Sequence, residues 1–123
     1  MPFQYILANL LAESDDAVGV IFLDDQGETV DLACADFATP YDLRVMGAYL
    51  GIYLRQVEEV AESAGLGEPR MIHIERSGLH VFAEPLTDGY HVALVQRRPT
   101  LVARARQNLS AAAAELNRQV FSD

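Results

Sequence analysis

One predicted helix, residues 40–64, carries more apolar surface than a single small domain can cover. A first apolar stripe recurs every three or four residues, which is the spacing of a helix that faces a core. Its members are Leu43, Met46, Gly47, Leu50, Leu54, Val57, Ala61 and Ala64. At about 100° per residue, a second strip lies on another side of the helix and consists of Val45, Tyr49, Ile52 and Val60. In a chain of 123 residues, we expect this second strip to face a partner.

Local signals mark both ends of this helix. Thr39 is placed as the N-cap, Pro40 takes the first helical position, and Asp42 is placed to complete a capping box. Gly65 and Gly67 supply the stop. Inside the helix, the four-residue spacing of Gly47 and Gly51 has two interpretations, of which close packing on a sheet is preferred over a helix–helix crossing.

Hydrophobic periodicity predicts the order helix, hairpin, helix, three-stranded meander, helix. The expected ranges are a helix at 3–12, strands at 17–23 and 28–35, a helix at 40–64, strands at 71–76, 79–84 and 90–96, and a last helix opening at Pro99-Thr100. Ser77-Gly78 and Asp88-Gly89 predict two-residue hairpin turns. We therefore expect an α/β fold of the α+β type, in the order α-β-β-α-β-β-β-α. A five-stranded antiparallel sheet has the long helix on one face and the two terminal helices on the other.

The composition excludes several classes of partner. The formal net charge is −9 and lysine is absent, whereas nucleic-acid binding needs clustered Lys and Arg. No apolar run approaches the roughly 20 residues that span a bilayer, and residues 1–9 lack the basic start of a signal peptide. The single Cys34 excludes an internal disulfide and is typical of a reducing compartment. We expect a cytoplasmic protein that neither binds nucleic acid nor inserts into a membrane.

The meander holds the only cluster of side chains with an obvious chemistry. With two-residue turns, Glu75 lies opposite His80, and the same sheet face also presents His73, Glu84 and His91. Two or three imidazoles and a carboxylate suit zinc. The residues spread over three strands without a short ligand spacing, however, so an ordinary cross-strand pair is the preferred interpretation and we expect no metal site.

No other segment predicts catalysis. Asp24-Asp25 before Gln26-Gly27 is typical of a turn, and Cys34 in an apolar strand is typical of a core residue. The sequence has no nucleophile elbow, Walker loop or dinucleotide fingerprint. We expect no catalytic residues and no cofactor.

Several short segments follow one another in a characteristic order between residues 3 and 116. They are residues 17–20 before 25–28, the small-residue helix from Met46 onward, Leu66-Gly67, residues 72–75, and residues 86–90 before the final strand. In this order and spacing the chain resembles the Roadblock (dynein light-chain) family, especially its bacterial members that regulate Ras-like GTPases of the gliding-motility type. The resemblance implies a roadblock/profilin-like fold, with residues 1–123 as one domain.

The resemblance also implies a homodimer, in which the long central helices of two subunits pack together and the third strands pair edge to edge. Such pairing would remove an exposed strand edge. The implied interface residues are Val45, Tyr49, Ile52 and Val60 on the helix and Met71, Ile72, His73, Ile74, Glu75 and Arg76 on the strand.

For function, the resemblance implies a non-catalytic platform for a Ras-like small GTPase. Some bacterial members accelerate GTP hydrolysis by ordering the GTPase's own switch loops. Phosphoryl transfer depends mostly on positioning and charge stabilisation, so a partner can speed it without donating a side chain. Arg44 and Arg55 on the polar band of the long helix are the candidate GTPase contacts.

Two alternatives stay open at this point. A small-ligand sensor module with a profilin-like fold would need polar residues that point into the core, and His73, His80 and His91 are the candidates. A metal-dependent enzyme would depend on a metal held by the same meander.

Overall fold

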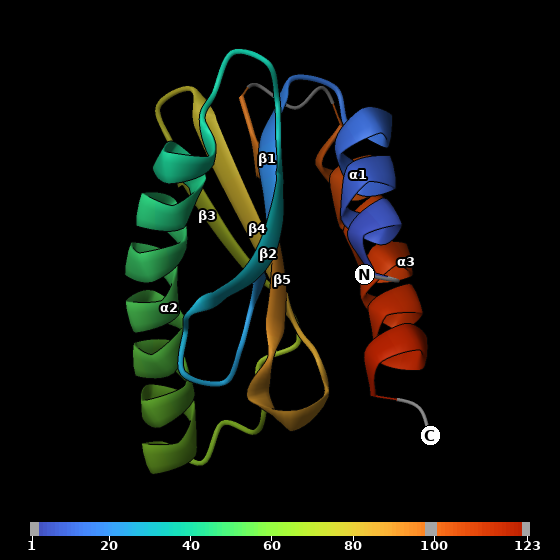
Figure 1. Ribbon diagram of the computed structural model, residues 1–123. Helices are drawn as coiled ribbons and strands as arrows, with labels where there is room; N and C mark the ends of the chain where they lie inside the picture. The colour runs from blue at the N-terminus through green and yellow to red at the C-terminus, as the bar shows by residue number, and fades with distance from the viewer. Residues whose placement is uncertain (1–2, 98–100, 122–123) are drawn as a thin grey trace.

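A five-stranded antiparallel sheet forms the middle layer of the protein (Figure 1). The computed structural model describes residues 3–97 and 101–121. The strands are β1 (Ala17–Leu23), β2 (Thr29–Cys34), β3 (Ile72–Arg76), β4 (Leu79–Pro85) and β5 (His91–Gln96). Their order across the sheet is β2-β1-β5-β4-β3, so β2 and β3 are the edge strands.

Helices cover both faces of the sheet. The terminal helices α1 (Gln4–Glu13) and α3 (Val102–Val120) lie side by side on one face, and α2 (Pro40–Ser63) lies on the other (Figure 1). A short 3₁₀ turn, η1 (Thr87–Gly89), precedes β5. The predicted fold class and element order are confirmed. Within the described part of the chain, no helix has the length and apolar character of a membrane-spanning segment.

The central strands supply two separate cores because successive side chains of a strand point to opposite faces. Every residue of β1 is buried. Val20 and Phe22 of β1 join the core beneath α1 and α3, while Ile21 and Leu23 join the core beneath α2. This double burial explains why β1 and β5 are apolar almost throughout.

Two glycines let α2 lie directly on the β1–β2 hairpin. A Cβ added at Gly51 would lie 2.9 Å from the Cα of Gly27, and one added at Gly47 would lie 3.1 Å from Oγ1 of Thr29. These distances confirm the interpretation of Gly47 and Gly51 as packing positions on the sheet. At the helix start, the amide of Asp42 donates to Oγ1 of Thr39 at 3.1 Å, as predicted for an N-cap.

The β1–β2 connection is the tight turn that its sequence predicts. Oδ1 of Asp24 accepts hydrogen bonds from the amides of Gln26 and Glu28, both at 2.9 Å. Gly27 takes the left-handed conformation with φ of 80°, which costs glycine little. The Asp24 carboxylate is therefore occupied by the turn.

The β4–β5 connection differs from the prediction. Pro85 pairs with His91, so five residues separate the strands in place of the expected two-residue turn. The amide of Leu86 donates to the carbonyl of Tyr90 at 2.7 Å. Oδ1 of Asn117 on α3 accepts from both the amide and the hydroxyl of Thr87, at 3.0 Å each. A contact from a distant helix thus stabilises the longer loop.

Not every member of the predicted core stripe of α2 is buried. Val57 and Ala64, expected in the core stripe of the long helix, are exposed. Met46 is half-buried, and the other members of that stripe are buried. The predicted start of the last helix at Pro99-Thr100 lies outside the described residues, and α3 begins at Val102.

Candidate functional site

The outward side of α2 is the most prominent apolar surface among the described residues. The predicted strip is exposed there, from 38% at Val45 to 65% at Tyr49. Two residues absent from the predicted strip, Tyr53 and Val57, belong to the same surface. We call Val45, Tyr49, Ile52, Tyr53, Val57 and Val60 the outer face of α2. A contiguous apolar surface of this kind usually marks an interaction site.

The apolar surface continues past the start of α2. A groove there is lined by Val18, Phe37, Ala38, Tyr41, Met46 and Leu79, together with Val45 of the outer face. The guanidinium carbon of Arg97 lies 3.9 Å from the centre of the Phe37 ring, a cation–π contact that holds one wall. Sequence periodicity missed Tyr53, which follows Tyr49 by one helical turn, and Tyr41, which precedes Val45 by one turn inside α2. It also missed Phe37, which lies before the helix.

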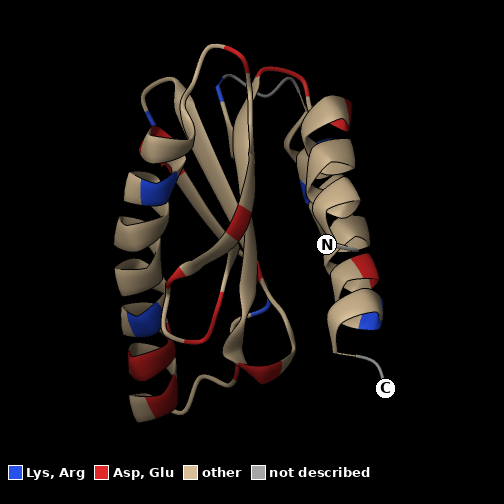
Figure 2. Cartoon of the chain, viewed as in Figure 1, with Lys and Arg blue, Asp and Glu red and all other residues tan. Residues whose placement is uncertain are grey.

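Charged residues border the outer face of α2. Figure 2 shows basic segments along α2 and acidic segments near its C-terminal end. Arg44 and Arg55 are both exposed. Nη2 of Arg55 donates to the backbone carbonyl of Gln26 at 3.1 Å. Arg55 is therefore tied to the β1–β2 turn, whereas the exposed Arg44 lies nearer the start of α2.

Strand β3 is an edge of the sheet, because β4 is its neighbour on one side only. In the described part of the chain, no strand pairs with its outer edge. The predicted interface residues of this strand divide between the two sheet faces. Ile72 and Ile74 are half-buried against the core beneath α2, while His73 and Glu75 are exposed on the face that α1 and α3 cover. Met71 packs against the core beneath α1 and α3.

The structure brings His73, Glu75 and His80 together. Glu75 is directly opposite His80 in the β3–β4 register, as predicted. Nε2 of His73 lies 3.0 Å from Nδ1 of His80, and the His73 ring stacks on Phe82 with centroids 4.3 Å apart. Partial burial lowers the pKa of His73, and the neighbouring His80 lowers it further. One nitrogen of each histidine and a carboxylate oxygen of Glu75 all lie within 4.8 Å of one another.

His91 does not share that sheet face, which corrects the sequence interpretation. It is buried on the α2 side, where its Nε2 lies 3.3 Å from Oε1 of Glu58. Burial lowers the pKa of His91, although the Glu58 carboxylate acts in the opposite direction. Glu84 remains on the predicted face, but its Oε1 accepts a hydrogen bond from the Ser110 hydroxyl at 2.6 Å.

This division weakens the sensor hypothesis. Of the three histidines that it placed in the core, His73 is exposed, His80 is half-buried and only His91 is buried. Three imidazoles on two sheet faces do not converge on one ligand.

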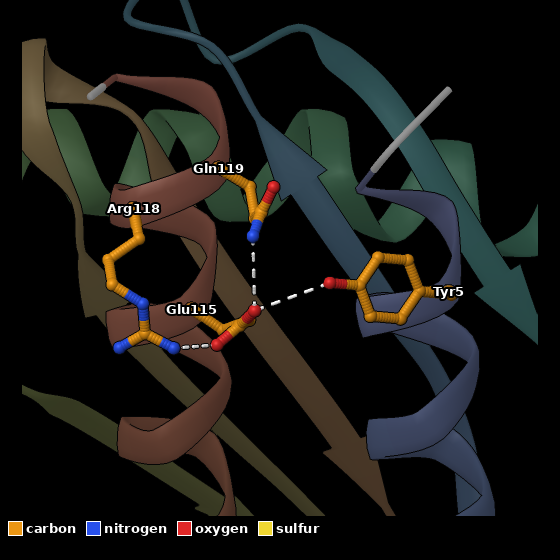
Figure 3. Close-up of polar contacts among 4 residues, drawn as sticks. All are labelled: Tyr5, Glu115, Arg118 and Gln119. Atoms are coloured by element: carbon orange, nitrogen blue, oxygen red, sulfur yellow. Dashed lines mark hydrogen bonds and ion pairs between the residues drawn. The ribbon is translucent and has the colours of Figure 1, made fainter. Parts of the chain in front are cut away.

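Cys34 and the seam between the terminal helices have structural explanations. Burial and the nearby carboxylates of Asp42 and Asp36 raise the pKa of the Cys34 thiol, which makes it a poor nucleophile near neutral pH. At the seam, the Tyr5 hydroxyl on α1 donates to Oε1 of Glu115 on α3 at 3.2 Å (Figure 3).

On α3, Glu115 also contacts Arg118 and Gln119 from the following turn (Figure 3). This exposed network joins the two terminal helices and presents no reactive group.

Comparison by sequence finds no match, either among models of protein families or among curated proteins. Comparison of structures gives clear matches over nearly the whole chain. A Roadblock/LC7 domain from Streptomyces avermitilis has a TM-score of 0.84 at 14% identity, covering 95% of this chain and 96% of that one. The gliding protein MglB from Thermus thermophilus has a TM-score of 0.85 at 14% identity, covering 98% of this chain and 90% of that one.

A third structure, described as MglB with a tetrameric arrangement, has a TM-score of 0.83 at 16% identity and covers 95% of this chain and 86% of that one. At such low identity the likeness concerns the fold. The predicted resemblance is confirmed for the fold. The chain therefore has the fold of the Roadblock/LC7 domains and of the MglB gliding proteins.

Proposed function

We propose that residues 1–123 form one Roadblock-like domain that works as a homodimeric, non-catalytic adaptor for a Ras-like small GTPase in the cytoplasm. The observation that carries the proposal is the exposed apolar outer face of α2, in a fold shared with MglB proteins. One of those proteins is described in a tetrameric arrangement and another as a gliding protein. The first description favours self-association.

The proposed dimer joins two outer faces of α2 and two β3 edges around a twofold axis. Val45, Tyr49, Ile52 and Val60 pack against their counterparts, which removes exposed apolar area from water. The strand from Met71 to Arg76 supplies backbone donors and acceptors that pair with the second copy. Because a twofold interface is self-complementary, one substitution alters both halves of it.

The GTPase contact lies beside the dimer seam in this proposal. Arg44 and Arg55 are exposed on α2 and carry the charge that attracts phosphate or an acidic loop. Arg55 already donates to Gln26, so it would hold the β1–β2 turn in place while Arg44 approaches the partner. The adaptor accelerates hydrolysis by ordering the switch loops of the GTPase, which supplies its own catalytic groups.

Tyr49→Arg tests the dimer. The change places two charges in a desolvated seam, which costs several kcal/mol of association free energy, and we expect a monomer in sedimentation velocity at micromolar concentration. Gln107→Arg, on the exposed side of α3, is the matched control and stays dimeric. A Tyr49→Arg protein that sediments as a dimer places the interface elsewhere.

The GTPase is tested by affinity capture from the native lysate with GDP or with a non-hydrolysable GTP analogue. We expect a small GTPase to be retained preferentially with the analogue, and Arg44→Glu to reduce its recovery without changing the sedimentation of the adaptor. Absence of any GTPase in both nucleotide states contradicts the proposed partner.

A further inference from the structure

The β3–β4 hairpin assembles three metal-ligand side chains at the edge of the sheet. Its turn at Ser77-Gly78 pairs Arg76 with Leu79 and Glu75 with His80. Residues two apart on a strand share a face, so His73 lies on the same face as Glu75 and reaches His80. None of the three residues is deeply buried, and an ion can approach from solvent.

The two imidazoles are already close to the separation that one metal ion requires. Their ring centroids are 5.2 Å apart, their planes differ by 23°, and Nε2 of His73 and Nδ1 of His80 are 3.0 Å apart. The two nitrogens therefore point toward each other. With Zn–N bonds of about 2.0–2.1 Å and tetrahedral angles, two nitrogens on one zinc ion lie about 3.4 Å apart. A small outward rotation of the rings is enough to admit the ion.

We propose that His73, His80 and Glu75 form a surface binding site for a divalent transition metal, for which Zn²⁺ is the fitting ion. Two imidazole nitrogens and one carboxylate oxygen are ligands that zinc accepts, and a fourth position stays open to water. The nitrogen donors disfavour Ca²⁺ and Mg²⁺, which prefer oxygen ligands.

The surroundings of the cluster are compatible with a bound cation. The Phe82 ring stacks on one face of His73 and limits the positions open to the imidazole, as suits a metal ligand. Glu75 brings a negative charge, while Arg106 on α3 contributes an opposing positive one. Glu84 is held by Ser110 and is left out of the ligand set. In the neutral pair, one ring donates its N–H to the facing nitrogen of the other ring. Both facing nitrogens can bind the metal once this proton has moved to the other nitrogen of the donor ring. Binding to the neutral pair therefore releases no proton.

A bound ion would hold the edge strand β3 against its neighbour β4. His73 and Glu75 belong to β3 and His80 to β4, so the metal crosslinks the outermost strand to its neighbour. An ion that binds the folded chain and not the unfolded one raises the thermal midpoint. This role is independent of the proposed GTPase partner.

The test uses the untagged full chain, freed of metal with a chelator and then dialysed. Isothermal titration with Zn²⁺ is expected to show one ion per chain, and Co²⁺ is expected to give the visible absorption of a tetrahedral nitrogen- and oxygen-ligated site. His80→Gln should weaken Zn²⁺ binding at least tenfold and abolish the zinc-dependent rise in thermal midpoint. Glu75→Gln, at an exposed position, should weaken binding to a smaller degree.

Glu84→Gln is the matched control, because it removes a carboxylate from the same sheet face while its amide oxygen still accepts from Ser110. It should bind Zn²⁺ like the unaltered chain. Failure of the unaltered chain to bind Zn²⁺, equal binding by His80→Gln, or a stoichiometry of one ion per two chains would each overturn the site. Circular dichroism of every variant confirms that it is folded.

Discussion

Helices α3 and α2 each pack one side on the sheet, but they differ in how much apolar surface is exposed on the other side. The buried side of α3 consists of Ala105, Leu109, Ala112, Ala113 and Leu116, and most of its outer side is polar. Helix α2 also buries one side but leaves Tyr41 and the six apolar residues of its outer face exposed on the other. α3 shares its sheet face with α1, whereas α2 covers its face alone (Figure 1). The difference indicates that α3 is complete within one chain and that α2 has a second surface to cover.

The largest expected effect comes from the inward side of α2. Leu54 is 3% exposed in the core beneath this helix. Leu54→Ala should lower the free energy of unfolding by about 2–5 kcal/mol, because it removes buried methyl groups and leaves a cavity. Urea denaturation in the Tyr49→Arg background, where dimerisation does not contribute, measures this value. A loss below about 1 kcal/mol would show that the inner side of α2 is no core.

The glycine contact under α2 should give the next largest effect. Gly51→Val places a branched side chain against the backbone of Gly27, which cannot rotate away, and should cost about 1–3 kcal/mol. Ala48→Val is the control, since Ala48 is exposed on the same helix. The same denaturation assay should separate the two variants. Equal stabilities would mean that α2 does not rest on the hairpin as closely as described.

A smaller effect is expected from pH at the contact between α2 and β5. Burial lowers the pKa of His91 in the folded chain, so the unfolded chain binds more protons near pH 6.5. The free energy of unfolding should therefore fall as the pH drops through 6.5, and this fall ends below the folded-state pKa. Comparing urea midpoints of the unaltered chain and of His91→Gln between pH 7.5 and 5.5 isolates this contribution. A variant with an unchanged pH slope contradicts it.

The smallest effect on the folding of the monomer is expected on the outer face of α2. Ile52 is 58% exposed, so Ile52→Ala in the Tyr49→Arg background should change the free energy of unfolding by no more than about 0.5 kcal/mol. In the unaltered background the same change should weaken the dimer, as measured by sedimentation equilibrium. A large loss in the monomer would remove the contrast between the two sides of α2.

The sequence predicted the layers well because periodicity reports burial directly. Strand β1 and helix α2 match their expected ranges to within one residue. The exposure of Val57 and Ala64 was not predictable from spacing alone. A helix of 24 residues is about 36 Å long, whereas strands of six or seven residues span about 20–24 Å. The end of α2 beyond the buried Ala61 therefore extends past the sheet and leaves Ala64 exposed, whereas Val57 is exposed because it lies toward the outer face.

The predicted sheet face of His91 was wrong because the register of the β4–β5 pair differs from the predicted one. A two-residue turn at Asp88-Gly89 would pair Glu84 with Ala93, but the observed loop pairs Glu84 with Val92. A shift of one residue sends every side chain of a strand to the opposite face. What fixes this loop is the contact between Thr87 and Asn117, 30 residues apart, and a local pattern does not contain it. The β3–β4 turn had no such contact, and its predicted register is confirmed.

The strand order also governs when the fold can close during synthesis. β5 lies between β1 and β4, so a nascent chain that ends before residue 91 can form both hairpins but cannot join them. The inner edges of β1 and β4 stay open until then, and open strand edges are where chains mispair. The apolar side of α1 waits longer still, because α3, which packs beside it, follows β5 in the chain. The sheet and the core beneath α1 are therefore complete only after β5 and α3 have been made.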